Sequence, residues 1–393
     1  MKITKIDVFL IDPKAPDNPV WTPVGCRIYT DGGIYGDGEA ALAYGLASNA
    51  AYGALIDLSK IIIGRDPLEN EVIWENLYKD TFWAQNGGAV MFGAMSAIDV
   101  ALWDIKAKFF NVPLYVLLGG KFRPKLRAYA SQLQFGWRGE KLALSKPQEY
   151  FDAAKKAVSE GYTAVKVDFL TFDEDGRRLN REDTTRLLPH KYVDMLVRRA
   201  AAVREAVGDE TDVIMECHSN IDAQGAVQLA RVVEPYKIWL IEEPITPTPD
   251  VNKFIANNIN IPIAHGERIF TRWQYKAYFA DHSIAMIQPD IGTNGGITET
   301  KKVCDMAHAY DIGVQIHVCS SPLLAAAALH LESAIPNFTI HEHHVYYLHE
   351  YNRVLCKYDY QPVCGYIAPP EIAGIGNEWS QTALSSVKLT TVR

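Results

Sequence analysis

The sequence lacks the features of several protein classes. No cluster of Lys and Arg offsets its net charge of −8, which argues against nucleic acid or an acidic membrane as a partner. The start of the chain is interrupted by Lys2, Lys5 and Asp7, so we expect neither a signal peptide nor a membrane span there. No other apolar run has the length of a spanning helix.

Cysteine is scarce and scattered. The six cysteines form no CxxC pair, a pattern that favours reduced thiols in a cytoplasmic protein over a disulfide framework. They are Cys26, Cys217, Cys304, Cys319, Cys356 and Cys364.

The length of 393 residues predicts two domains. Residues 1–12, 26–30 and 34–39 have the pattern of a small antiparallel sheet. Residues 40–110 then become helical, most clearly at 94–108. We predict an α+β capping domain over residues 1–124, a barrel over 125–357, and a tail over 358–393 that returns to pack on the capping domain.

Strand-like and helix-like segments alternate beyond residue 125, which predicts an α/β protein with a (β/α)₈ TIM barrel. An open doubly wound sheet is the alternative, but no Gly-rich phosphate turn opens these helices, and Gly292-Thr-Asn-Gly-Gly is only a weak match. Residues 170–191 form an oversized, charged connection, interpreted as a solvated excursion or an interface. The eight predicted strands are 126–132, 164–169, 212–218, 238–244, 261–267, 283–290, 313–318 and 338–343.

Three apolar runs each end in an acid, namely Glu216, Glu242 and Glu267. They recur at about 25-residue intervals, the length of one βα unit. Because the carboxyl ends of parallel strands converge, the three carboxylates are expected to share one point, which requires a cation. Hard oxygen ligands without a thiolate favour Mg²⁺.

A second set of ionisable residues continues the pattern at other strand ends. The cation would stabilise the charge that develops when a carboxylic acid loses its α-proton. His317, oriented by Asp290, is suited to accept that proton, and His218 is suited to protonate a departing β-hydroxyl. Glu342 could assist at the substrate carboxylate if the crowded site raises its pKa.

Three further residues are predicted to contact the substrate. Lys166 and Asp168 share a strand face and point into the barrel, although an ion pair between them is the alternative interpretation. His265 also faces inward. Glu243 is expected to point away from Glu242 into a structural salt bridge.

The segment His341-Glu-His-His suggests zinc, but adjacent strand residues alternate faces, so these histidines cannot share one ion. Only Glu342 is retained there as a site residue.

Together these motifs resemble the enolase superfamily, and within it the sugar-acid dehydratases of the mandelate racemase group. The resemblance covers nearly the whole chain, through SAIDVALWDIKAK, IEEP, HGER and QPDIGTNGGIT. It implies a capping domain built from both termini, a modified TIM barrel, Mg²⁺ held by the three glutamates, and a symmetric homo-oligomer. The arrangement Glu216-Cys-His218 is most similar to galactonate and mannonate-type dehydratases, and the family places its specificity loops near residues 18–25 and 82–88.

Two departures from the family pattern affect the predicted reaction. Glu216 stands where the group usually has Asp, and Lys166-Val-Asp168 replaces the Lys-x-Lys of two-base racemases. We therefore predict dehydration of an aldonate-type sugar acid to a 2-keto-3-deoxy acid. The alternatives are a racemase or epimerase, a regulatory protein of weak activity, and a zinc hydrolase, although the last needs a His-x-His that residues 126–132 lack.

Overall fold

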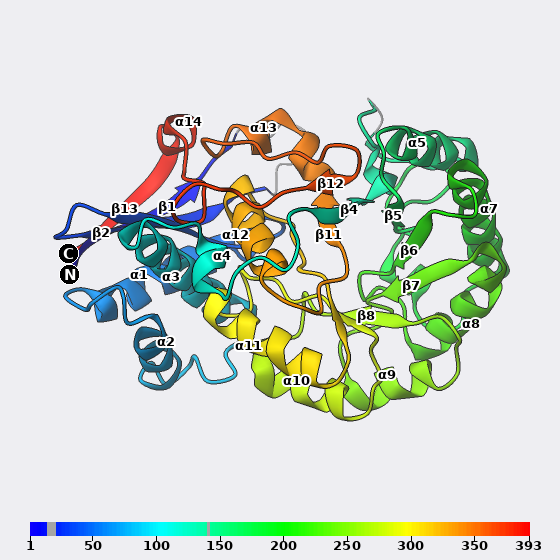
Figure 1. Ribbon diagram of the computed structural model, residues 1–393. Helices are drawn as coiled ribbons and strands as arrows, with labels where there is room; N and C mark the ends of the chain where they lie inside the picture. Colours follow the sequence, from blue (N-terminus) through cyan, green and yellow to red (C-terminus); the bar gives the residue numbers. More distant parts are fainter. Residues whose placement is uncertain (14–20, 140–141) are drawn as a thin grey trace.

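The computed structural model describes residues 1–13, 21–139 and 142–393, so part of the predicted 18–25 loop lies outside it. The chain forms a barrel and a smaller unit built on a four-stranded antiparallel sheet, at right and left in Figure 1. The order in the small sheet is β13-β1-β2-β3. Its strands are β1 (Ile3–Ile11), β2 (Val24–Thr30), β3 (Tyr35–Ala40) and β13 (Val387–Val392).

The last strand joins the sheet that the first strand begins. β13 pairs antiparallel with β1 from Ile6↔Val392 to Ile11↔Val387, and Figure 1 shows the two chain ends side by side. The end of the chain thus packs on the N-terminal sheet. The boundaries at residues 124 and 357 remain a proposal.

Helix α3 covers the small sheet and is its most apolar element. It packs against β3, where the Cβ of an alanine at Gly38 would lie 1.8 Å from the Ala97 carbonyl oxygen. Among the described residues α3 is the one helix long and apolar enough to cross a membrane, but 72% of its apolar window is buried inside the protein. Burial on the sheet accounts for its composition. The helices of this unit are α1 (Ser48–Ile62), α2 (Asn70–Lys79), α3 (Gly88–Phe109) and α4 (Leu114–Leu117).

This close contact predicts the response of the capping unit to two alanine substitutions. Gly38→Ala places a methyl group inside the α3 backbone, and the resulting overpacking should cost about 1–3 kcal/mol or more. Gly53→Ala, on an exposed part of α1 with open space around its Cβ position, should stabilise the protein by about 0.5–1 kcal/mol. Urea unfolding of both variants measures the difference. Equal stabilities would contradict the close α3–β3 contact.

Eight parallel strands form the barrel in chain order. β11 pairs with β4 from His341↔Ala128 to His344↔Ser131, and the bridge Val314↔Phe338 joins β10 to the segment that leads into β11. The short strand β12 (Tyr366–Ile367) adds antiparallel to β4. The barrel strands are β4 (Leu126–Ser131), β5 (Ala164–Val167), β6 (Asp212–Glu216), β7 (Ile238–Glu242), β8 (Ile263–His265), β9 (Met286–Ile287), β10 (Gly313–Val314) and β11 (His341–His344).

Helices surround the strands, and a large apolar core lies between the two layers. Several show the expected one-sided burial, as in α7, where Leu196, Ala200 and Val203 are buried. α12 is instead buried on nearly every side. The helices of the barrel are α5 (Pro147–Ser159), α7 (His190–Val207), α8 (Ala223–Val233), α9 (Pro249–Ala256), α10 (Thr271–Ala280), α11 (Gly296–Ala309) and α12 (Pro322–Ser333). Short turns are η1 (Leu133–Phe135), α6 (Arg181–Thr184), η2 (Glu234–Tyr236), η3 (Val345–Leu348), α13 (Glu350–Arg353) and α14 (Gln381–Leu384).

The barrel strands lie where the sequence predicts them, but several end sooner. β10 stops at Val314, although the Gln315 and His317 N–H groups still donate to the carbonyls of Ile287 and Pro289. The alternate N–H groups donate to side chains instead, Ile316 to Glu332 at 3.3 Å and Val318 to Glu342 at 3.0 Å. The carboxyl end of this strand is therefore held by buried acids.

Candidate active site

A cavity of about 540 Å³ opens at the carboxyl ends of the barrel strands. The barrel contributes its polar wall, including Asp168, His218, Glu267, Asp290 and His317. The capping unit contributes Ala41, Leu42, Tyr44 and Ala89. The cavity thus lies between the two units, at the end of the barrel where TIM-barrel active sites are built.

His317 lies between two carboxylates. Its Nδ1 is 2.7 Å from Asp290 Oδ2 and its Nε2 is 2.9 Å from Glu267 Oε2. Burial would lower the pKa of this imidazole, but Glu267 and Asp290 raise it well above the ordinary value. The ring is therefore an imidazolium while Glu267 holds it.

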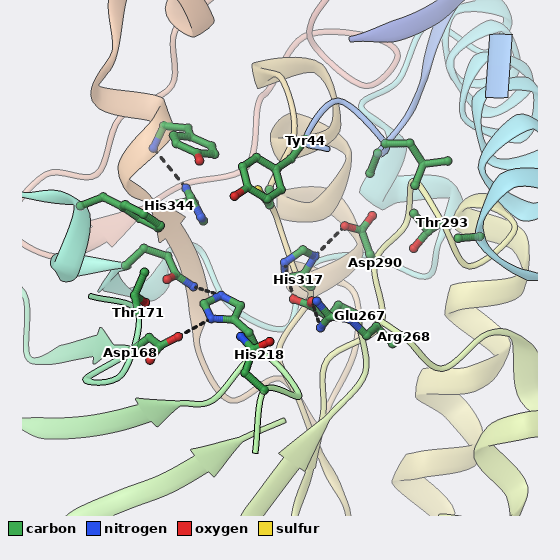
Figure 2. Close-up of a pocket in the computed structure, with 18 of the residues that line it drawn as sticks. Tyr44, Asp168, Thr171, His218, Glu267, Arg268, Asp290, Thr293, His317 and His344 are labelled. Carbon is green, nitrogen blue, oxygen red and sulfur yellow. Dashed lines mark hydrogen bonds and ion pairs between the residues drawn. The ribbon is translucent and has the colours of Figure 1, made fainter. Parts of the chain in front are cut away.

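His218 forms a second histidine–aspartate pair across the same cavity (Figure 2). Its Nδ1 is 2.7 Å from Asp168 Oδ2, and its Nε2 is 3.2 Å from the Gln132 amide nitrogen. Burial opposes the charge, but Glu216 and Asp168 raise the pKa of His218 to about 9. A protonated His218 can donate a proton to a leaving group.

His218 reaches the cavity from a left-handed turn, since β6 ends at Glu216 and His218 has φ 46°. The predicted strand to residue 218 is thus two residues too long. The side chain nevertheless lies in the cavity wall.

Lys166 lies inside the barrel, outside the cavity lining, and is fully buried. Its Nζ lies 2.5 Å from Glu242, 2.9 Å from Glu342 and 3.3 Å from Glu216. Burial would lower the pKa of Lys166, but Glu242 and Glu342 raise it well above the ordinary value. The expected alternative, an ion pair with Asp168, is wrong, because Asp168 pairs with His218.

One ammonium group thus faces three buried carboxylates. Burial and repulsion from Glu216 raise the pKa of Glu242, whereas His218 and Lys166, against burial, lower the pKa of Glu216 to about 2. Among the described residues, none donates a hydrogen bond to the buried Oε2 of Glu216, which lies 3.3 Å from Lys166 Nζ. The cluster carries an excess of negative charge, which favours uptake of a cation.

The three predicted metal ligands are neighbours, but they do not surround a common point. Glu216 and Glu242 lie side by side in β6 and β7, whereas Glu267 pairs with His317 and Arg268. Among the described residues, no three His, Cys, Asp or Glu side chains are gathered closely enough to hold a metal ion.

Glu342 lies outside the cavity lining and is fully buried. It accepts hydrogen bonds from Ser131 Oγ at 2.6 Å and from the Val318 N–H at 3.0 Å. Burial would raise its pKa, but Lys166 and His317 lower it. Glu342 was expected to donate a proton only if its pKa was raised. That condition is therefore not met.

His265 also lies outside the cavity lining and is fully buried. Neither ring nitrogen has a hydrogen-bond partner among the described residues. Burial lowers its pKa to about 4, so the ring is neutral.

Arg268 belongs to the site, although it is not among the residues predicted from the sequence. Its guanidinium lines the cavity and forms ion pairs with Glu243 and Glu267. Glu243 is thus in the salt bridge expected of it, and the pair anchors the loop that carries Glu267. The motif HGER contained the signal, because Arg268 directly follows a predicted ligand.

The charged excursion is largely exposed to solvent over residues 173–183, as predicted, and it also forms a wall of the cavity. Arg178 donates to the hydroxyl of Tyr44 from the capping unit at 3.2 Å and lies over the rings of Phe135 and Phe172. The excursion therefore connects barrel and cap at the cavity mouth. Its lining residues are Leu170, Thr171, Arg178, Leu179, Arg181 and Thr184.

The histidines of β11 lie on different faces of the strand. His341 pairs with Glu332 at 2.6 Å and His343 with the Tyr162 hydroxyl at 2.6 Å, whereas His344 lines the cavity (Figure 2). The sequence predicted only Glu342 as a site residue in this segment, and the structure adds His344 to the cavity lining. His344 is two residues beyond Glu342, and that spacing places both on one face.

Fold, cavity and paired acid–base residues define a two-domain barrel enzyme, and sequence comparison gives its family. Residues 149–383 match the family described as enolase C-terminal domain-like, and residues 6–119 match the mandelate racemase / muconate lactonizing enzyme N-terminal domain. The chain belongs to the enolase superfamily, as its motifs predicted.

Relatives with named activities cover almost the whole chain. A D-galactonate dehydratase of Pectobacterium atrosepticum is 33% identical over 96% of this chain and 92% of its own. One from Ralstonia nicotianae is 31% identical over 96% and 91%. A solved enolase-superfamily member from Salmonella Typhimurium is 48% identical, covers 100% of both chains and has a TM-score of 0.96. The predictions of the fold and of an enzyme of this superfamily are confirmed.

Proposed function

We propose that the protein dehydrates a sugar acid of the aldonate class to a 2-keto-3-deoxy acid. The observation that carries this proposal is the presence of two histidine–aspartate pairs, His317–Asp290 and His218–Asp168, in one cavity. β-Elimination of water requires a base at the α-carbon and an acid at the β-hydroxyl, and the two pairs supply one residue for each. The named activity of the D-galactonate dehydratase relatives supports the same reaction class.

His317 is the proposed base. Asp290 orients its ring through Nδ1, which leaves Nε2 to accept the α-proton of the substrate once Glu267 has released it. The electron pair of the broken C–H bond moves toward the carboxylate, and an enediolate forms. Arg268 holds the displaced Glu267 through the pair between their side chains.

His218 is the proposed acid. Asp168 and Glu216 keep its imidazole protonated, so a proton is available when the C3–O bond breaks. Loss of the hydroxyl as water gives an enol, which becomes the 2-keto product by tautomerisation. The Gln132 amide nitrogen, 3.2 Å from Nε2, can donate only to an unprotonated ring nitrogen, so this contact must open when Nε2 carries the proton.

The buried acids fit a Mg²⁺ ion, and Glu216, Glu242 and Glu267 would hold it. The fit rests on the hard oxygen donors and on the excess of negative charge around Lys166. Glu267 would exchange its pair with His317 for the cation and keep its pair with Arg268. When bound, the ion would supply charge stabilisation to the enediolate.

Racemisation needs a second base instead of an acid. Lys166, the residue suited to that role by its strand position, lies below the cavity in ion pairs with three glutamates. Dehydration is therefore the better supported reaction.

The acid assignment predicts a separation of two steps. In His218→Asn the amide keeps the hydrogen bond to Asp168 but cannot donate the proton, so dehydration should fall about 10²–10⁴-fold. Exchange of the α-proton with solvent deuterium, measured by NMR on recovered substrate, should persist. His308→Asn, on an exposed helical position, is the matched control. Normal dehydration by the His218 variant would show that another group is the acid.

The substrate is tested by assaying the protein with Mg²⁺ against a library of aldonates and aldarates, using a colour reaction for 2-keto-3-deoxy acids. A product from one or a few aldonates supports the proposal. Deuterium incorporation without keto product would indicate a racemase or epimerase instead. Absence of both, together with no Mg²⁺ binding by calorimetry, would indicate a regulatory protein.

A further inference from the structure

The histidine of the cavity wall with no place in the proposed acid–base chemistry is His344. Its side chain lines the cavity between the end of β11 and the tyrosines of the mouth, and 4% of the residue is exposed. Its ring packs against Tyr346 with centroids 4.5 Å apart. Such a confined imidazole has a fixed orientation toward whatever enters.

The protonation state of the ring follows from its hydrogen bond. The backbone N–H of Tyr346 donates to Nδ1 of His344 at 3.2 Å, which caps the turn η3. A backbone N–H cannot accept a hydrogen bond, so Nδ1 must carry a lone pair, and the single proton of the neutral ring lies on Nε2. Burial also lowers the pKa of this imidazole to about 3, so the neutral form persists across the working pH range.

Among the described residues no hydrogen bond to Nε2 occurs, and Figure 2 shows the ring directed into the opening above His317. The ring of Tyr346 packs against one side of His344, and the cavity lies on the other. A lone neutral donor in such a wall selects an uncharged acceptor.

Strand position indicates which part of the substrate this donor meets. β11 lies between β10, which precedes His317, and β4, which precedes Gln132. The three carboxylates lie across the barrel on β6, on β7 and just after β8. A sugar acid whose carboxylate end lies toward these acids would therefore direct its hydroxylated chain toward His344.

We propose that His344 is a substrate-binding residue that donates its Nε2–H to one hydroxyl oxygen of the sugar acid and selects the configuration at that carbon. The inference rests on the proposed dehydratase function, because it assumes a polyhydroxylated substrate. An epimer places the oxygen on the other side of the chain, out of line with a donor that cannot move.

Two substitutions test the roles of the two ring nitrogens separately. In His344→Asn the side-chain oxygen can still accept from the Tyr346 N–H, since Asn is a good cap, but the amide is too short to reach the Nε2 position. In His344→Gln the amide N–H reaches that position. Loss of a neutral hydrogen bond should lower kcat/KM about 10-fold in the Asn variant, mainly through KM, and Gln should restore part of the loss. His308→Asn is again the control.

The decisive readout uses substrates that lack one hydroxyl each. The unaltered enzyme should discriminate against the analogue deoxygenated at the bound carbon, and His344→Asn should lose that discrimination at this carbon alone. Discrimination unchanged at every carbon, in a protein that dehydrates the parent acid, overturns the inference and leaves the proposed function standing. A protein that dehydrates no sugar acid overturns the proposed function and this inference with it.

The tautomer is testable without turnover. The ¹⁵N shifts of the His344 ring should show a protonated Nε2 and an unprotonated Nδ1, unchanged between about pH 6 and pH 8 because the group stays neutral. A protonated Nδ1, or a titration in this range, overturns the inference even if the substituted proteins fail to fold.

Discussion

Replacing His317 with Asn should abolish both dehydration and α-proton exchange. The amide nitrogen of Asn can donate to Asp290 as Nδ1 does, so the pocket keeps its shape while the base is lost. General base catalysis contributes about 10²–10⁴-fold, and kcat should fall by that factor while the affinity for the sugar acid changes little. Steady-state kinetics and deuterium exchange measure the two steps.

The comparison with His218→Asn shows which histidine is the base and which is the acid. Both variants should lose dehydration, but only the His317 variant should lose exchange. If the His317 variant still exchanges the α-proton and the His218 variant does not, the two histidines have the opposite roles. His308→Asn should behave as the unaltered enzyme in both assays.

Replacing Lys166 with Met should produce the largest loss of stability. The substitution removes the one ammonium group that contacts Glu216, Glu242 and Glu342. Removing one partner of a buried ion pair costs about 3–5 kcal/mol. In metal-free buffer the free energy of unfolding should fall by that amount, as measured by urea unfolding.

Mg²⁺ should restore part of this loss. A cation bound by Glu216 and Glu242 would compensate the charge that Lys166 leaves, so the variant should gain more stability from Mg²⁺ than the unaltered protein does. Lys155→Met, at an exposed helical position, should show neither effect. An equal Mg²⁺ effect in both proteins would mean that the ion does not bind at these carboxylates.

The sequence predicted the strands of the barrel and the residues at their ends because period and position are local signals. Glu216, Glu242, Asp290 and His317 follow apolar runs at regular spacing, and the structure brings all four to one end of the barrel. Active sites of TIM barrels lie at the carboxyl ends of the strands, and this position suggested roles for the four side chains.

The pairing of these side chains could not be predicted in the same way. Whether Lys166 meets Asp168 on its own strand or glutamates on other strands depends on the cross-section of the closed barrel. Likewise, the excursion wall depends on Tyr44 of the distant capping unit, which accepts a hydrogen bond from Arg178. Contacts between residues far apart in sequence leave no periodic signal.

His344 shows a different limit. The sequence shows that side chains alternate between the two faces of β11. Which face meets the cavity depends on how β11 pairs with β4, a strand about 200 residues earlier in the chain. The structure fixes that register and, through the Tyr346 N–H, the position of the ring proton.

The pairing of β1 with β13 has a consequence for the order of folding. Asp7 accepts a hydrogen bond from Thr391 across 384 residues of chain. The entropy of closing so long a loop is lost before the contact contributes, unless the intervening barrel has already become compact. The small sheet should therefore acquire its edge strand late, after the barrel has folded. A spectroscopic probe placed on β13 should then report a slower refolding phase than probes placed on the barrel.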